Sequence, residues 1–405
     1  MLSDLDEYMS TRKLQGIVVY GDTTLANPDL TYVVGGNLAR GGIFVKRLHH
    51  EPLLVTSNLD IGTARRLGRV RRIETSTEWG SEKLAAKYGR ENAQQHLIKS
   101  ILRGEGIDGK VSIYGRNDLA TGIRLADELR KLGVRIVGEA SPTVLESTRE
   151  TKSGKEIANI RDVGARTGKT VETILRSLQS MKRKRGHLYL KGTRATVGYV
   201  KKLISSKLAE EDLIAPEGTI FAIGPSGADP HNAGDPSDPI KEGRLIVFDI
   251  FPQAGTGYWF DLTRTFVIGR ADVKAKRLFE TVAEAQNASL DLLEDGVTGE
   301  SAMLKACQVI EHHGYKTVRE VFEGKTSSIS SGFNHSLGHG VGLTIGERPY
   351  LSFLSKDPLK SRQVVTVEPG IYLPGYGGVR IEDTVAITAR GIDTLASVDK
   401  EPELA

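Results

Sequence analysis

Cysteine is almost missing from this sequence, which has only Cys307 among its 405 residues. One thiol cannot form a disulfide within the chain or build a zinc site from several cysteines. A chain without disulfides fits a reducing compartment. An excess of one charge sign is also absent, since 55 basic and 51 acidic residues leave a net charge of +4. So weak a surplus argues against a nucleic acid or an anionic membrane as partner.

Long apolar runs are absent as well. No uninterrupted apolar stretch reaches the roughly 18 residues of a membrane span. The acidic start MLSDLDEYMSTRK lacks the apolar core of a signal peptide. We therefore expect a cytoplasmic protein. The residues that are present suit a folded chain with a large core, because 39% of them are hydrophobic and 45 are glycine.

Two regions with different residue patterns follow one another along the chain. Up to residue 147, short apolar runs alternate with helical stretches, which predicts an α/β domain over residues 1–147. A polar segment at 146–156 is typical of a linker that leads into a long helix. Beyond it, β-like runs rich in glycine and proline enclose two amphipathic helices, which predicts an α+β domain over residues 148–405.

Acidic residues interrupt the apolar runs of the second domain. Four acids lie in segments that we predict to be buried strands: Asp249 in LIVFDIF, Asp261 in YWFDLTRTFVI, Glu368 in VVTVEPGIY and Glu382 in GVRIEDTVAIT. A buried carboxylate is costly unless it is paired or binds a metal. Arg264 and Arg380 are the only bases within these runs. We expect 379–388 to form one strand, in which Arg380 and Glu382 share a face, so that Arg380 orients Glu382.

A glycine-rich segment, NHSLGHGVGLTIGE at 334–347, carries His335 and His339 four residues apart. The pair alone fits either a metal site or a structural role. One imidazole with several carboxylates is a ligand set suited to Mn, Co, Fe or Zn. Four carboxylates carry enough charge for two divalent ions, which at about 3.5–4 Å apart deprotonate a shared water and stabilise a tetrahedral intermediate. The pattern therefore predicts hydrolysis.

These motifs together resemble the pita-bread metallopeptidase family, which includes methionine aminopeptidase, aminopeptidase P, prolidase and the metal-free creatinase. The resemblance spans about residues 147–390 and is carried by STRETKSGKEIANIR, PHNAGDP, FDIFPQAGTGYWFDLTRTF, HSLGHGVGL and VEPGIYLPGYGGVRIEDT. The last phrase is especially close to aminopeptidase P and prolidase. The resemblance implies a creatinase-like N-terminal α/β domain, a pita-bread catalytic domain, a homodimer and short peptide substrates.

The resemblance also implies roles for individual residues. Five positions match the family's metal ligands: Asp249, Asp261, His339, Glu368 and Glu382. Asp261 and Glu382 are expected to bridge two ions, and Glu368 is expected to carry a proton as well. His231 and His335 match the histidines that contact the substrate carbonyl or the oxyanion. The residues alone leave His231 open as an ordinary loop histidine.

Two features depart from the family pattern. Eleven residues separate Asp249 from Asp261, one more than usual, and the loop between His231 and Asp249 is also one residue longer. A bulge can absorb such an insertion. Gly346 stands where proline-directed peptidases carry a histidine. Since one lost oxyanion donor costs about 10²–10³ in rate, either another side chain substitutes or the substrate is not an ordinary Xaa-Pro peptide.

The sequence leaves three functions open. The first is a dinuclear metallopeptidase that removes the residue before proline or cleaves Xaa-Pro dipeptides. In it, a hydroxide that bridges the metals attacks the carbonyl, and Glu368 acts as general base and then general acid. The second has the same fold and metals but hydrolyses a non-peptide C–N bond, as creatinase does. The third is an inactive peptide-binding protein, which the five metal-competent residues disfavour.

Overall fold

The structure is a computed structural model that describes residues 2–405. The chain folds as two compact units, residues 1–149 and 150–405. Among the described residues, no helix combines the length and the apolar character that a membrane crossing requires.

The first unit is built on one six-stranded sheet, in the order β4-β3-β2-β1-β5-β6. Its strands are β1 (Gly16–Gly21), β2 (Gly42–Arg47), β3 (Leu53–Thr56), β4 (Arg72–Thr75), β5 (Lys110–Tyr114) and β6 (Arg135–Ile136). Its helices are α1 (Leu5–Thr11), α2 (Pro28–Val34), α3 (Ile61–Leu67), α4 (Ser81–Tyr88), α5 (Arg90–Gly104), α6 (Leu119–Lys131) and α7 (Val144–Glu150), the last ending at the junction with the second unit. β1 pairs antiparallel with β2 and parallel with β5, so the sheet is mixed.

The second unit contains two larger sheets, in the orders β11-β12-β14-β22 and β16-β15-β17-β20-β21. Their strands are β11 (Thr219–Ile223), β12 (Leu245–Ile250), β14 (Leu262–Ile268), β15 (Gly338–Val341), β16 (Ile345–Leu351), β17 (Val364–Val367), β20 (Asp383–Ile387), β21 (Ile392–Thr394) and β22 (Glu403–Leu404). Smaller sheets are formed by β7 (Lys182–Lys184), β8 (His187–Leu190) and β9 (Thr193–Arg194), by β10 (Leu213–Ile214) with β13 (Gln253–Ala254), and by β18 (Gly370–Leu373) with β19 (Gly377–Arg380).

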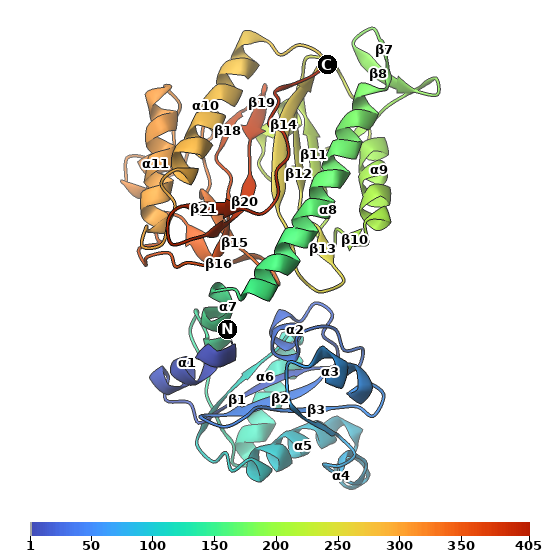
Figure 1. The fold of residues 1–405 in the computed structure, drawn as a ribbon, viewed down its shortest axis with the longest axis vertical. Coiled ribbons are helices and arrows are strands. Elements are labelled where there is room, and N and C mark those ends of the chain that lie inside the picture. Colours follow the sequence, from blue (N-terminus) through green and yellow to red (C-terminus); the bar gives the residue numbers. More distant parts are fainter. Residues whose placement is uncertain (1) are drawn as a thin grey trace. The chain divides into compact units, whose positions relative to one another are not determined.

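Five helices accompany these strands: α8 (Gly154–Gln179), α9 (Val197–Glu210), α10 (Val273–Leu290), α11 (Gly299–His312) and α12 (Arg319–Phe322). In Figure 1, α10 and α11 lie on one side of the strands of this unit, and α8 and α9 lie on the other. The long helix α8 begins with a capping box, in which Ser153 and Glu156 satisfy each other's backbone N–H groups.

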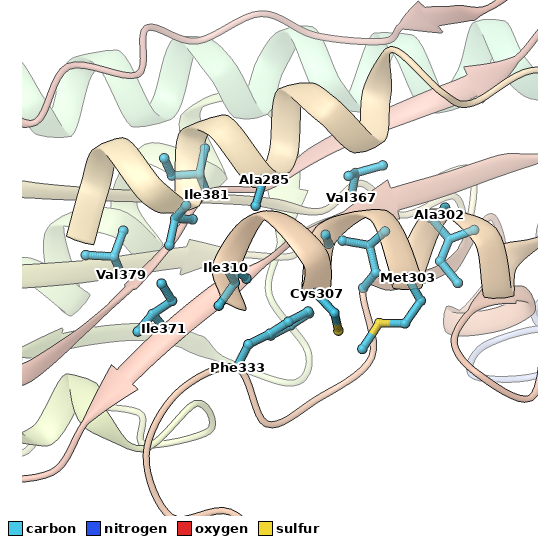
Figure 2. Packing of buried hydrophobic residues seen from close by; sticks show 14 of the residues in the cluster. Ala285, Ala302, Met303, Cys307, Ile310, Phe333, Val367, Ile371, Val379 and Ile381 are labelled. Carbon is cyan, nitrogen blue, oxygen red and sulfur yellow. The ribbon is translucent and has the colours of Figure 1, made fainter. Parts of the chain in front are cut away.

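The core under α10 and α11 joins these helices to the strands that carry two of the candidate acids. Figure 2 shows Ala285 of α10 between Val367 and Ile381, which directly precede Glu368 and Glu382, and Ile310 of α11 belongs to the same cluster. The lone Cys307 lies in the same core, and burial raises the pKa of its thiol to about 12. Its packing rather than its reactivity therefore accounts for its place.

Two strands are interrupted at the candidate acids. The predicted single strand 379–388 is wrong, because it is divided into β19 and β20 by a gap at residues 381–382. A matching gap at 368–369 separates β17 from β18. On either side of these gaps the two segments of the chain pair with each other. Val367 lies opposite Asp383, and Gly370 lies opposite Arg380. Glu368 and Glu382 therefore lie between two ladders rather than inside a strand.

The longer connection between Asp249 and Asp261 does not disturb the sheet. Asp249 lies inside β12 opposite Thr263 of β14, and the pairing of these strands stays in register. The extra length is taken up by a turn next to β13, where Trp259 donates its backbone N–H to the carbonyl oxygen of Gly342 at 2.9 Å. Asp261 immediately precedes β14, so it also lies outside its predicted strand.

Helix α8 passes close to the candidate site at Gly164. A Cβ atom at this position would lie 2.5 Å from Cε2 of Phe260, a fully buried ring that directly precedes Asp261. We expect Gly164→Ala to lower the free energy of unfolding by about 1–3 kcal/mol through overpacking, although alanine favours a helix. Gly122→Ala in α6 is the matched control, since nothing lies within 4 Å of its Cβ position. This control should gain up to about 1 kcal/mol from helix propensity.

Chemical denaturation of the two variants separates these effects. If both substitutions raised the free energy of unfolding equally, α8 would have space for a methyl group next to the ring of Phe260.

Candidate metal centre

One pocket of about 480 Å³ in the second unit gathers all of the predicted site residues. Eight predicted residues line it: His231, Asp249, Asp261, His335, His339, Glu368, Arg380 and Glu382. They come from both large sheets, from the small β18–β19 sheet and from the loop after β11. Folding thus brings together positions that are up to 151 residues apart in sequence, from His231 to Glu382.

The innermost group consists of Asp261, His339 and Glu382. Each of them offers one metal-competent ligand atom, and these atoms all lie within 4.8 Å of one another. Nε2 of His339 is 3.6 Å from Oδ2 of Asp261 and 3.4 Å from Oε1 of Glu368. Asp249 lines the same pocket, so the structure places all five predicted ligands around one space.

Two buried threonines hold the carboxylates in place. The Thr263 hydroxyl donates to Oε2 of Glu382 at 2.7 Å, and the Thr366 hydroxyl donates to Oε1 of Glu368 at 3.2 Å. Thr366 also accepts the backbone N–H of His339 at 3.0 Å. Sequence reasoning missed both threonines. The available signal was their closeness to the acids in sequence, since Thr263 lies two residues after Asp261 and Thr366 lies two residues before Glu368.

Arg380 contacts Asp249 directly and Glu382 only through Thr263. Its Nη2 donates to Oδ2 of Asp249 at 2.6 Å, and its Nη1 donates to the Tyr372 hydroxyl at 2.8 Å. Its Nε also donates to the Thr263 hydroxyl at 3.2 Å, and that hydroxyl donates to Glu382, so Arg380 acts on Glu382 through Thr263 and not by the direct contact that a shared strand face would give. The physical reason is the gap at 381–382, which ends the strand alternation on which the prediction depended.

His335 has both ring nitrogens engaged. Nδ1 lies 2.7 Å from the carbonyl oxygen of Ser336 and must donate to it, while Nε2 lies 3.0 Å from the Tyr372 hydroxyl. Burial, together with the charge of Arg380, lowers the pKa of His335 to about 3, so the ring is neutral and Nε2 accepts from Tyr372. In this arrangement His335 has no N–H free for a substrate. Tyr372 therefore links His335 to Arg380.

His231 is the more open of the two predicted histidines. It lies exposed in the loop after β11, where its backbone N–H donates to Oδ1 of Asp229 at 3.1 Å. Its side chain lines the pocket, and within residues 2–405 its ring makes no hydrogen bond. Its N–H is available to a ligand.

The pocket holds more negative charge than its own bases can balance. Burial raises the pKa values of Asp261 and Glu382 well above their ordinary range, and repulsion between neighbouring carboxylates adds to the effect. Burial likewise raises the pKa of Glu368 to about 7, although Arg380 opposes the shift. Three buried carboxylate oxygens of the pocket have no hydrogen-bond partner among residues 2–405: Oδ1 of Asp249, Oδ1 of Asp261 and Oε1 of Glu382. Such oxygens, grouped with one imidazole, are what a divalent cation requires.

Comparison with known proteins agrees with this geometry. The sequence pattern of metallopeptidase family M24 matches residues 158–389, more than half of the chain. The chain belongs to metallopeptidase family M24. The resemblance to the pita-bread metallopeptidases is thereby confirmed, and a divalent metal is implied for this M24 chain.

Individual relatives extend the comparison. The chain is 34% identical to the Xaa-Pro dipeptidase of Pyrococcus horikoshii over 258 residues, which cover 64% of this chain and 66% of the relative, just under two thirds of its length. A crystal structure of prolidase from the same organism has a TM-score of 0.72 at 25% identity, covering 99% of both chains. The X-Pro aminopeptidase of Thermotoga maritima has a TM-score of 0.75 at 22% identity, covering 97% of this chain and 99% of that one. The predicted fold class is confirmed.

Gly346 is built into a turn that suits glycine in this M24 chain. Its φ is +75°, where L side chains are strained. Its N–H points to Nδ1 of His339 at 3.3 Å, and its carbonyl accepts the Tyr350 hydroxyl at 2.9 Å. A buried ion pair between Lys152 and Glu347, 2.7 Å long, holds the neighbouring position. Nδ1 of His339 also lies 3.1 Å from the carbonyl oxygen of Gly340, to which it donates when Nε2 is free to bind a metal ion, so the Gly346 turn lies against the imidazole but does not supply its hydrogen bond.

Asp383, directly after Glu382, is an acid of the same unit whose negative charge is balanced by neighbouring cations. Nη2 of Arg264 lies 2.7 Å from its Oδ1, and Nζ of Lys400 lies 2.6 Å from its Oδ2. Although burial alone would raise the pKa of Asp383, these two cations lower it. Neighbouring acids in the chain thus have opposite electrostatic surroundings.

This contrast predicts opposite effects of neutralising the two acids. In metal-stripped protein, Glu382→Gln should raise the melting temperature, because it relieves repulsion between the buried carboxylates. Asp383→Asn should cost about 3–5 kcal/mol, because it leaves the buried guanidinium of Arg264 without its partner.

Calorimetry with and without Mn²⁺ measures both effects. The rise in melting temperature on adding Mn²⁺ should shrink in Glu382→Gln. A stripped Glu382→Gln protein as unstable as Asp383→Asn would contradict the description of Glu382 as uncompensated.

Proposed function

We propose that this chain is a metal-dependent peptidase that acts on short peptides at the bond before proline, as an Xaa-Pro dipeptidase or aminopeptidase. The observation that carries the proposal is the pocket itself, in which three unpartnered carboxylate oxygens surround a candidate site for metal ions. The names of the M24 relatives, an Xaa-Pro dipeptidase and a prolidase, support the choice of substrate.

We further propose that Asp249, Asp261, His339, Glu368 and Glu382 hold two divalent ions, of Mn, Co, Zn or Fe. Oxygen donors with one imidazole suit this group of metals. Ions bound there supply a Lewis acid that activates water and polarises the substrate carbonyl. A pair of divalent ions also balances the charge that Arg380 alone leaves uncompensated in the pocket.

The side chains of the pocket then divide the remaining work. Glu368, with a pKa raised to about 7 in the metal-free protein, is suited to accept a proton from water and return it to the leaving nitrogen. Thr366 holds one of its oxygens and so limits its rotation. His231 has an unengaged ring on the pocket wall and supplies an N–H donor to the developing oxyanion. His335 keeps Tyr372, and through it Arg380, in position.

The size of the pocket limits the substrate. A volume of about 480 Å³ lies within the range of roughly 300–1,000 Å³ typical of small-molecule sites. It accommodates a few residues and excludes a folded protein. On the family resemblance we also propose a homodimer that works in the cytoplasm, with residues 148–405 as the catalytic domain.

One observation favours a second function, the hydrolysis of a non-peptide C–N bond. Gly346 occupies the place of a substrate-contacting histidine, and its left-handed backbone disfavours any side chain there. This suits a non-peptide C–N hydrolase on the same fold. The relatives named as Xaa-Pro peptidases favour the first function, and the complete set of metal-competent residues argues against an inactive protein.

A substrate panel tests the proposal. Metal-stripped protein reloaded with Mn²⁺ or Co²⁺ should cleave Xaa-Pro dipeptides or Xaa-Pro-Yaa tripeptides and leave Met-Ala-type peptides intact. Glu368→Gln should lower kcat by about 10²–10⁴, the usual contribution of a general acid–base group. Glu284→Gln, at a half-exposed acid of α10 that pairs with His313, is the matched control and should keep wild-type kcat.

Loaded protein that cleaves no member of the panel would overturn the peptidase proposal. Activity on a non-peptide amidine or amide alone would support the C–N hydrolase instead.

A further inference from the structure

A glutamine lies in the apolar core of the second unit, behind the candidate metal centre. Gln286 of α10 is completely buried. Its Nε2 donates two hydrogen bonds, to the carbonyl oxygen of Val367 at 3.0 Å and to that of Ile381 at 3.2 Å. An amide NH₂ group has two hydrogens, so one side chain satisfies both carbonyls at once.

These two carbonyls belong to the residues directly before Glu368 and Glu382. Val367 is the last residue of β17 and Ile381 lies in the gap before β20, so both lie where the β17–β20 ladder gives way to the β18–β19 ladder. Figure 2 shows Ala285, the neighbour of Gln286, lying between Val367 and Ile381. Gln286 therefore ties together the two chain segments at the point where the paired acids leave them.

The other end of the amide is held by Lys400. Nζ of Lys400 donates to Oε1 of Gln286 at 2.8 Å and also lies 2.6 Å from Oδ2 of Asp383. An ammonium group only donates and a carbonyl only accepts, so these neighbours permit a single orientation of the amide. The segment that carries Lys400 is itself anchored, since Arg264 donates to the carbonyl of Val398.

We propose that Gln286 is a positioning residue that sets the separation of Glu368 and Glu382, and that Lys400 locks it in its working orientation. The inference rests on the proposed function insofar as these two acids bind metal. Gln286 touches neither the pocket nor a carboxylate, and it acts only through the two backbone carbonyls. Groups that orient metal ligands usually change metal affinity by about 10–100-fold when removed.

The test measures metal binding directly, by calorimetric titration of stripped protein with Mn²⁺ and by the visible spectrum of the Co²⁺ form. Gln286→Met keeps the length of the side chain but removes both donors. We expect it to weaken Mn²⁺ binding at least ten-fold and to alter the Co²⁺ spectrum. Ser289→Ala is the matched control, because Ser289 is equally buried one turn along α10 and bonds only the helix carbonyl of Ala285. It should lower stability without changing the spectrum.

A second pair of variants keeps the test decisive if Gln286→Met does not fold. Lys400 is partly exposed, at 31% of its side chain, so Lys400→Met should fold. It frees the amide and should weaken Mn²⁺ binding several-fold, whereas Lys400→Arg restores a donor and should recover most of the affinity.

The outcomes separate this inference from the proposed function. The positioning role would be overturned if Gln286→Met kept wild-type Mn²⁺ affinity and an unchanged Co²⁺ spectrum, even if the protein proves to be a peptidase. If Gln286→Met does not fold, the same result in Lys400→Met would overturn it. Metal binding that depends on Gln286, in a protein that cleaves no proline peptide, would overturn only the substrate. A wild-type protein that takes up no divalent ion would overturn both.

Discussion

Mutual repulsion among buried carboxylates is the constraint around which the second unit is organised. Asp261, Glu368 and Glu382 are confined in one pocket, and the single guanidinium that lines it is committed to Asp249. Burial makes each negative charge costly, and proximity adds to the cost. The apolar core under α10 and α11, the threonine hydroxyls and the strand pairings hold these groups together against their repulsion. A pair of divalent ions would relieve this repulsion. Since the fold of the whole unit holds the carboxylates together, the affinity for metal depends on the stability of the whole unit.

The interrupted strands explain how acids can occupy such positions in a sheet. A continuous strand directs successive side chains to opposite faces and engages its carbonyl groups in the ladder. At the gaps, residues 368–369 and 381–382, two residues of each segment leave the regular strand pattern. Backbone groups released there need other partners, and a buried amide from α10 serves two of them. The departure from regular structure is local, and ordinary pairing resumes on both sides.

Much of this was accessible from the sequence, and the limits have physical causes. Acids within apolar runs and a histidine between glycines identified the pocket, because a buried charge is conspicuous against a hydrophobic background. The gap at 381–382 carries no glycine or proline to mark it, although Pro369 marks the matching gap at 368–369. A direct contact between Arg380 and Glu382 was therefore expected in place of the ion pair with Asp249. Gln286 gave no signal at all, because a single polar residue on a helix is normally solvated, and only tertiary packing buries it.

The last strand of the second unit has a bearing on how the site is held. β22 aligns in parallel beside β14, and the segment leading to it carries the lysine that fixes the core amide. The amide that joins the two acid-bearing segments therefore takes its fixed orientation from a segment outside both large sheets' ligand-bearing strands.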